Sequence, residues 1–193
     1  TATNADITQT VALDVTGTTT LAAGSSNDIT LSNASNNFAT VVITSGEDVT
    51  LVDEDAIVLG AATISRTYDV TAAGPITNSG ALVITRSATF EAGSGNDITL
   101  GNTSNNFQRA VIITSGKDVT LVDAGAIDLG ASTVSGTYSV TATTGDISNS
   151  GNLVITGAAT FITTAADSNI ILDQSGNAFA STVTMKAGDG TDE

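Results

Sequence analysis

Two nested repeats constrain the fold of this chain more than any other feature. A short phrase that opens with Ile or Val recurs throughout, and longer phrases return in a second, slower cycle. Residues 24–38 read GSSNDITLSNASNNF and residues 93–107 read GSGNDITLGNTSNNF, so Ile29 and Ile98 occupy equivalent positions. Periodic short strands along a whole chain are typical of a stacked array, in which each unit buries its apolar face against its neighbours.

The short phrases divide the chain into turns of similar length. Eight openers can be aligned, and their spacings follow a cycle of three in which the third is the longest: Ile7, Ile29, Val49, Ile76, Ile98, Val119, Ile147 and Ile170. We therefore predict an all-β chain, a single domain over residues 1–193 that forms a right-handed parallel β-solenoid (β-helix). It should have about eight coils of 20–28 residues, each with about three short strands, stacked roughly 4.8 Å apart. An antiparallel sandwich would not require matching residues to return once per coil.

Alternation within the phrases predicts which side chains are buried. Ile29 and Leu31 point to one side of a strand, and Asp28 and Thr30 point to the other. We expect a single buried stack of the openers, with a leucine beside it in several coils: Ile29, Val49, Ile76, Ile98, Val119 and Ile147, with Leu31, Leu51, Leu100 and Leu121. The seven aromatic residues recur at equivalent positions, so they are expected to fill the core.

Composition excludes several classes of function. The chain carries 5 basic and 20 acidic residues, a net charge of −15, which disfavours nucleic acid and anionic lipid as partners. No window of 18 apolar residues predicts a membrane span. The chain contains no histidine, cysteine or tryptophan, and its five basic residues are scattered along the sequence. We expect no enzymatic activity and no cofactor, with calcium as the exception considered below.

Longer phrases resemble a known group of proteins. The patterns NNFxxxVxITSGxDVTLVDxxAIxLG and ISNSGNLVITGAATF are similar to β-strand repeats of large bacterial surface and secreted proteins of the filamentous-haemagglutinin-like adhesin group. The resemblance covers essentially the whole chain. It implies an extracellular or cell-surface β-solenoid that serves mostly as the stalk of a fibre, and it supplies no catalytic motif.

A recurring aspartate is the strongest candidate for chemistry. The residue before the opener is acidic in six coils: Asp6, Asp28, Asp48, Asp97, Asp118 and Asp146. In one stack these carboxylates would lie about 5 Å apart and repel one another, so hydrogen bonds, solvent or a cation must offset the repulsion. One interpretation is that each aspartate accepts a backbone N–H at a turn. The alternative is a metal site, with calcium or another hard cation between coils.

Two further patterns carry weaker hypotheses. The residue after the opener is usually Thr, as in Thr30, Thr99 and Thr120, which is common on exposed strands but would also suit an ice-binding face. Asn36 and Asn105 each begin an Asn-Asn-Phe phrase, and we expect internal turns in which their amides bond to the backbone. A lateral face could also bind surface glycans.

The chain shows no blunting segment at either end of the predicted stack. Because an open parallel stack exposes unpaired backbone groups, solenoids generally need polar caps. We therefore expect end-to-end association with other copies, or with neighbouring repeats of a longer chain.

Overall fold

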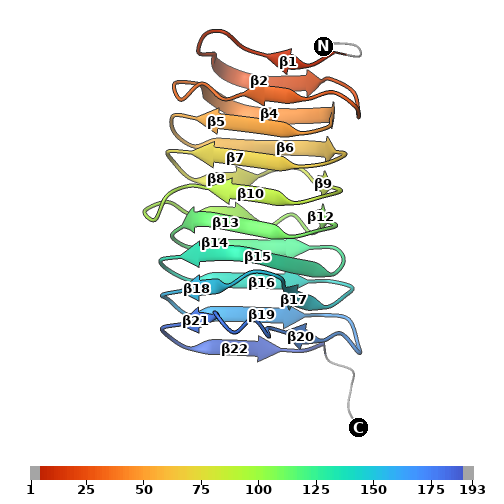
Figure 1. Cartoon of the computed structure of the whole chain (residues 1–193), viewed down its shortest axis with the longest axis vertical. Helices are drawn as coiled ribbons and strands as arrows, with labels where there is room; N and C mark the ends of the chain where they lie inside the picture. The colour runs from red at the N-terminus through yellow and green to blue at the C-terminus, as the bar shows by residue number, and fades with distance from the viewer. Residues whose placement is uncertain (1–4, 189–193) are drawn as a thin grey trace.

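The chain winds into a parallel β-solenoid of about nine turns (Figure 1). The computed structural model describes residues 5–188, and these form 22 strands and no helix. Accordingly, no helix in this part of the chain is long and apolar enough to cross a membrane. Every strand pair is parallel, and the chain passes back and forth between two sheets; in some turns two short successive strands lie in the same sheet.

The first sheet begins with β1 and contains every strand that runs in one direction across the rod. Its members are β1 (Ile7–Thr8), β3 (Ile29–Leu31), β5 (Val49–Asp53), β7 (Tyr68–Ala72), β10 (Ala88–Glu91), β13 (Val111–Gly116), β15 (Ile127–Val134), β17 (Ile147–Asn149), β18 (Leu153–Ile155), β20 (Ile170–Ile171) and β21 (Ala178–Phe179).

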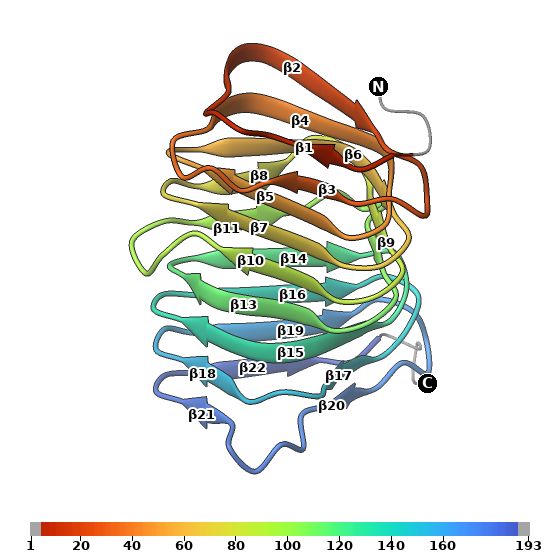
Figure 2. The same cartoon turned by 45° about the horizontal axis from the view of Figure 1, so that its top comes forward.

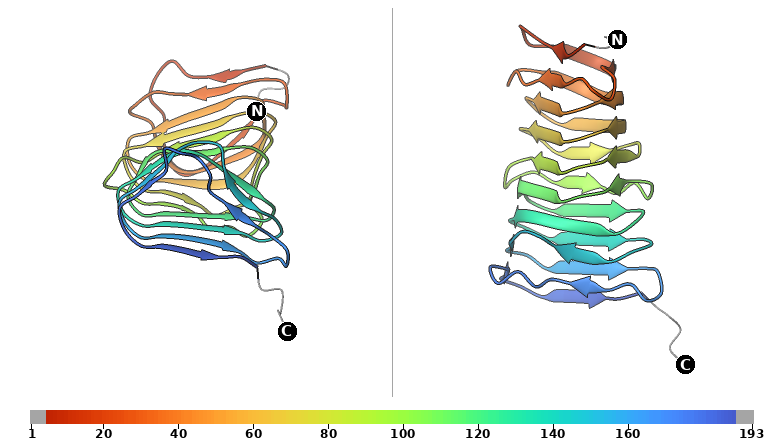
Figure 3. Two further views of the ribbon diagram at one scale, coloured as in Figure 1. Left: turned by 60° about the horizontal axis from the view of Figure 1, so that its bottom comes forward. Right: turned by 45° about the vertical axis from the view of Figure 1, so that its right-hand side comes forward.

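The second sheet contains the strands that return in the opposite direction, as a side view shows (Figure 3). Its members are β2 (Asp14–Ala22), β4 (Asn37–Gly46), β6 (Ile57–Ile64), β8 (Ile76–Asn78), β9 (Leu82–Ile84), β11 (Ile98–Leu100), β12 (Asn106–Phe107), β14 (Val119–Asp123), β16 (Tyr138–Ala142), β19 (Ala159–Thr163) and β22 (Val183–Lys186). The long strands β2 and β4 form the curved end of the rod near the N-terminus (Figure 2).

Each turn is therefore one strand from each sheet, and not the three strands that we predicted. Three strands occur only where a strand is broken in two, as at β8 and β9, which both pair with β6. The turns also differ in length. Val111 and its partner Leu129 span one of the shortest turns, and Ala159 and its partner Val183 span one of the longest.

The predicted stack of openers is wrong, although all its members are buried. Val49 pairs with Ile29 in one direction and with Tyr68 in the other, so Ile76 is not its neighbour. Ile76 lies in the second sheet, where it pairs with Ile57 and Ile98. The longest predicted coils, such as the one from Val49 to Ile76, each contain one and a half turns. This explains why about nine turns replace the eight that we expected.

The longer repeat accordingly makes three and a half turns. Starting at Ile29, three full turns lead through Val49 and Tyr68 to Ala88, and a further half turn reaches Ile98 in the opposite sheet. The same step takes Ile76 in the second sheet to Ile147 in the first. Equivalent residues of consecutive repeats therefore lie in opposite sheets.

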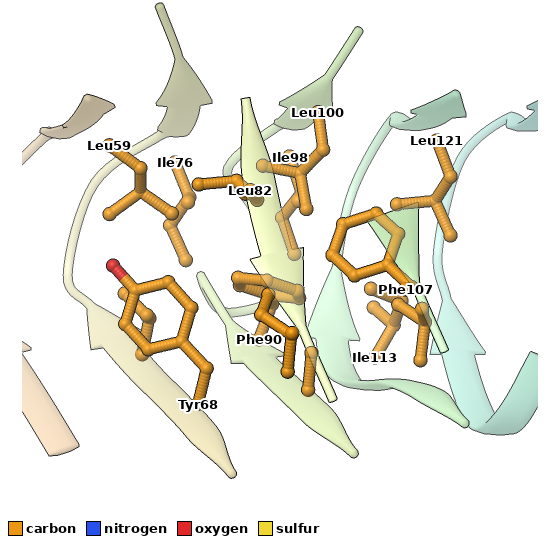
Figure 4. Packing of buried hydrophobic residues seen from close by; sticks show 14 of the residues in the cluster. Leu59, Tyr68, Ile76, Leu82, Phe90, Ile98, Leu100, Phe107, Ile113 and Leu121 are labelled. Atoms are coloured by element: carbon orange, nitrogen blue, oxygen red, sulfur yellow. The ribbon is translucent and has the colours of Figure 1, made fainter. Parts of the chain in front are cut away.

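One apolar cluster fills the space between the sheets. Ile29, Ile98 and Leu100 are fully buried, and burial of each such side chain contributes about 1.5–3 kcal/mol. Tyr68 and Phe90 meet edge to face, with ring centroids 6.1 Å apart, and lie among the aliphatic side chains of both sheets (Figure 4). The predicted core role of the aromatic residues is confirmed: six of them are fully buried, and Phe179 packs partly buried against the cluster.

Candidate functional site

The six predicted aspartates do not form one column. Asp6, Asp28 and Asp48 precede strands of the first sheet in three successive turns. Asp97 and Asp118 precede β11 and β14 of the second sheet. The sixth, Asp146, precedes β17 of the first sheet, in a later turn. The half turn in each repeat causes this separation, because it carries equivalent residues to opposite sheets.

The six aspartates nevertheless share one local arrangement. In each case Oδ1 accepts the backbone N–H of the residue that takes the same place one turn later. Asp6 accepts from Asp28 at 2.9 Å, and Asp28 accepts from Asp48 at 3.1 Å. The remaining bonds run from Thr67 to Asp48, Asp118 to Asp97, Thr137 to Asp118 and Asn169 to Asp146. This geometry supports the interpretation in which each carboxylate satisfies a turn amide.

Basic residues neutralise part of this charge. Arg66 reaches Asp48 at 3.2 Å and Glu47 at 3.3 Å. In the next repeat Lys117 replaces Glu47 and lies 3.3 Å from Asp118. The backbone N–H and hydroxyl of Thr137, with Lys117 beside them, hold the pKa of Asp118 below its usual value.

The described residues contain no group of three or more carboxylates that could hold a metal ion. In each aspartate one oxygen is already directed at an N–H of the next turn, which leaves the second oxygen and solvent for any cation. The role of Asp6, Asp28, Asp48, Asp97, Asp118 and Asp146 as calcium ligands thus remains a prediction.

The threonines that follow the openers are also divided between the sheets. Thr8, Thr30 and Thr50 form a short column in the first sheet. A longer column in the second sheet includes positions that the sequence alignment missed. Val58 occupies this column in one of its nine turns. The other eight turns have a hydroxyl residue there: Thr18, Thr40, Thr77, Thr99, Thr120, Ser139, Thr160 and Thr184.

The prediction for the Asn-Asn-Phe phrases is confirmed. Asn36 and Asn105 are fully buried at a corner of the rod. The amide of Asn105 donates to the carbonyls of Leu100 and Val122, both at 3.2 Å, and its oxygen accepts the N–H of Leu82 at 3.0 Å. These bonds join three successive turns, so one side chain satisfies backbone groups that the corner leaves unpaired.

Two buried carboxylates at the same corner were missed. Asp53 and Asp123 are 2% and 0% exposed. Oδ2 of Asp123 accepts the N–H of Phe107 at 2.7 Å, while Oδ1 accepts that of Gly125 at 2.6 Å. Burial raises the pKa of both carboxyl groups. A signal was present in the sequence, because the alternation Val49, Leu51, Asp53 continues the inward face.

Comparison with known proteins identifies the repeat but not an activity. A family described as repeats of unknown function (DUF5649) matches residues 1–45, 46–114 and 116–186. The last two segments begin at Gly46 and Gly116, which are equivalent positions one repeat apart. No curated protein and no solved structure matches the chain.

Proposed function

The chain belongs to this family of repeats of unknown function, and from that premise we propose that it is a structural segment of a secreted or surface-anchored fibre. The observation that carries the proposal is the continuity of the two ladders. Hydrogen-bonded pairing runs from β1 to β20 in the first sheet and from β2 to β22 in the second. Nothing interrupts the stack between these strands, so the described chain forms one stiff rod.

The interior supports a mechanical role. A single apolar cluster extends from Leu21 to Phe161, and buried amides and carboxylates tie successive turns together at the corners. Because each turn is held by its neighbours, the stability of such a rod grows with the number of repeats. A fibre segment needs this property, since it must keep its length and direction under load.

The resemblance of the repeats to filamentous-haemagglutinin-like adhesins supports an extracellular or cell-surface location. The net charge of −15 keeps such a rod soluble and discourages unspecific contact with other acidic surfaces. In this setting the rod spaces a binding region from the cell or contributes to a matrix. Its partners along the axis are neighbouring repeats of the same chain or other copies stacked end to end.

A cation-binding role is the second candidate. Asp6 and Asp28 lie in adjacent turns, and neither forms an ion pair with any of the residues that the structure describes. A hard cation would bind the oxygens that the turn amides leave free. In that case calcium would stabilise the folded rod, whereas a plain scaffold would be indifferent to it.

The scaffold proposal can be tested by changing the number of repeats. Inserting one more copy of residues 46–115 should lengthen the rod by about 17 Å, for three and a half turns of about 4.8 Å each, without changing its cross-section. Small-angle X-ray scattering measures both dimensions. A globular or aggregated product would contradict the proposal. Antibody labelling of intact producing cells and of their medium tests the location separately.

A further inference from the structure

Three arginines that are far apart in the sequence form a ladder on one edge of the rod. Arg66, Arg86 and Arg109 each stand two positions before Tyr68, Ala88 and Val111, which pair with one another in three successive turns. The N–H of Arg86 also donates to the carbonyl of Arg66 at 3.0 Å. The basic residues that looked scattered in the sequence are therefore gathered by the fold.

The fold itself does not require these arginines. One repeat later, glycine occupies the positions of two of them: Gly136 matches Arg66, and Gly157 matches Arg86. All three arginines are exposed, and among the described residues neither Arg86 nor Arg109 forms an ion pair. Arg66 pairs with Glu47 and Asp48 of its own chain. The two remaining charges, Arg86 and Arg109 in adjacent turns, point to an anionic partner.

The same edge is acidic in the three preceding turns. Asp6, Asp28 and Asp48 stand one position before Ile7, Ile29 and Val49, which continue the ladder that leads to Tyr68. They are thus one residue nearer to their strands than the arginines are to theirs. We name the six residues the charged edge: Asp6, Asp28, Asp48, Arg66, Arg86 and Arg109. It runs beside the starts of β1, β3, β5, β7, β10 and β13, with the acidic half toward the N-terminal end (Figure 2).

This arrangement is complementary to itself. A two-fold axis between Asp48 and Arg66, perpendicular to the rod, places turns one, two and three of one copy against turns six, five and four of another. Asp6 then meets Arg109 and Asp28 meets Arg86, and each contact occurs twice. Asp48 and Arg66, which already form an ion pair within each copy, lie next to the axis. The spacing along the rod matches, because both halves have the same repeat of about 4.8 Å per turn. The flexible arginine side chains span the one-residue offset between the two halves.

We propose that the charged edge pairs with the same edge of a second copy, so that two rods lie side by side and antiparallel. Such isologous contacts are the commonest route to a dimer. The partner is argued from charge complementarity: a second copy supplies carboxylates at the spacing of the arginines. Complementary charges across an interface fix register and orientation more than they add affinity, so the expected dimer is weak and specific. Nucleic acid is disfavoured by the net charge of −15.

A charge swap tests the pairing directly. The variant Arg86→Asp with Arg109→Asp makes the edge acidic at every position except Arg66, and Asp6→Arg with Asp28→Arg makes it basic at every position except Asp48. In sedimentation velocity the unmodified chain should dimerise with increasing concentration. Each variant alone should associate at least about tenfold more weakly, and an equimolar mixture should form a one-to-one heterodimer.

Further measurements keep the test decisive. Because Asp6 caps an N–H of the next turn, the milder variant Arg86→Gln with Arg109→Gln is used if the basic variant fails to fold, and it should also dissociate the dimer. Scattering should show a doubled cross-section where the rods overlap and a length greater by only about three turns, or about 14 Å, because turns seven to nine of each copy extend beyond the other. End-to-end association would double the length. A chain that stays monomeric, an unchanged dimer in the variants, or a monomer that binds heparin through the arginines would overturn the proposal.

Discussion

The carboxylate of Asp123 accepts the backbone N–H of Phe107 from the preceding turn over 2.7 Å. Asp53 holds Phe38 in the same way and at the same distance. Each carboxylate is buried, and each uses its second oxygen for a local turn amide, at Gly125 or Asp55. An acceptor with two oxygens is therefore needed at this corner.

Replacing Asp123 by Asn should destabilise the rod by about 1–3 kcal/mol, because the amide nitrogen would face one of the two N–H donors and leave it unpaired. Urea unfolding followed by circular dichroism measures the effect. Asp14→Asn is the matched control, since Asp14 is exposed on β2. Equal stability of the two variants would show that the buried carboxylate is dispensable.

The stability lost on replacing an aspartate by Asn should depend on pH in opposite directions for Asp123 and Asp118. Burial raises the pKa of Asp123 in the folded chain, so its contribution is fully present below the unfolded value of 3.8 and declines as pH rises through the folded pKa. The difference in unfolding free energy between the unmodified chain and Asp123→Asn should therefore shrink from about pH 4 toward neutral pH.

The pKa of Asp118 is instead lowered, chiefly by hydrogen bonds from Thr137. Its contribution is present above the unfolded value of 3.8 and is lost as pH falls through the lower folded pKa. The penalty of Asp118→Asn should therefore diminish on acidification below about pH 4. Unfolding curves collected at several pH values test both trends, and parallel curves for the two variants would refute the assignment.

The buried ladder gives a test of the corrected register. Ile98 is fully buried between Ile76 and Val119, so Ile98→Asp places an unpaired charge in a dry core and should cost about 4 kcal/mol or more. Thr99→Asp on the same strand points outward and should have little effect. Comparable losses in the two variants would mean that the inward and outward faces of β11 are misassigned.

Calcium should leave the thermal midpoint of the chain unchanged if the aspartates serve the turn amides alone. The reason is that each Oδ1 already accepts an N–H, and Arg66 and Lys117 already balance part of the charge. Differential scanning fluorimetry with calcium and with a chelator measures this. A rise of many degrees in calcium would favour the cation-binding candidate, because a ligand of the folded state stabilises it.

Much of the fold follows from the sequence. Alternation in residues such as Val49-Thr50-Leu51 correctly predicts which side chains face the core, because the period of a strand is two. The order of stacking was harder to predict. Tyr68 is the true neighbour of Val49, although it does not open a phrase of the same type. Stacking requires compatible inward side chains rather than identical ones, so matching phrases led to the wrong partners.

The charged edge was also hard to predict, because it too depends on which residues stack on one another. The step from Arg66 to Arg86 is the length of one turn, and so is the step from Arg86 to Arg109. These spacings can be recognised as single turns only once the turn length is known. The buried carboxylates are different, since the inward alternation through Leu51 already indicated Asp53. The six aspartates were correctly expected at turns, but their division into groups depends on the half turn.

The half turn in each repeat links the length of the rod to the direction in which its faces point. An added or lost repeat rotates everything beyond it by half a revolution, while two repeats restore the original orientation. In such an array the parity of the repeat number would decide which side of the fibre displays a given surface. A change in repeat number would thus alter the orientation of a surface as well as its distance along the fibre.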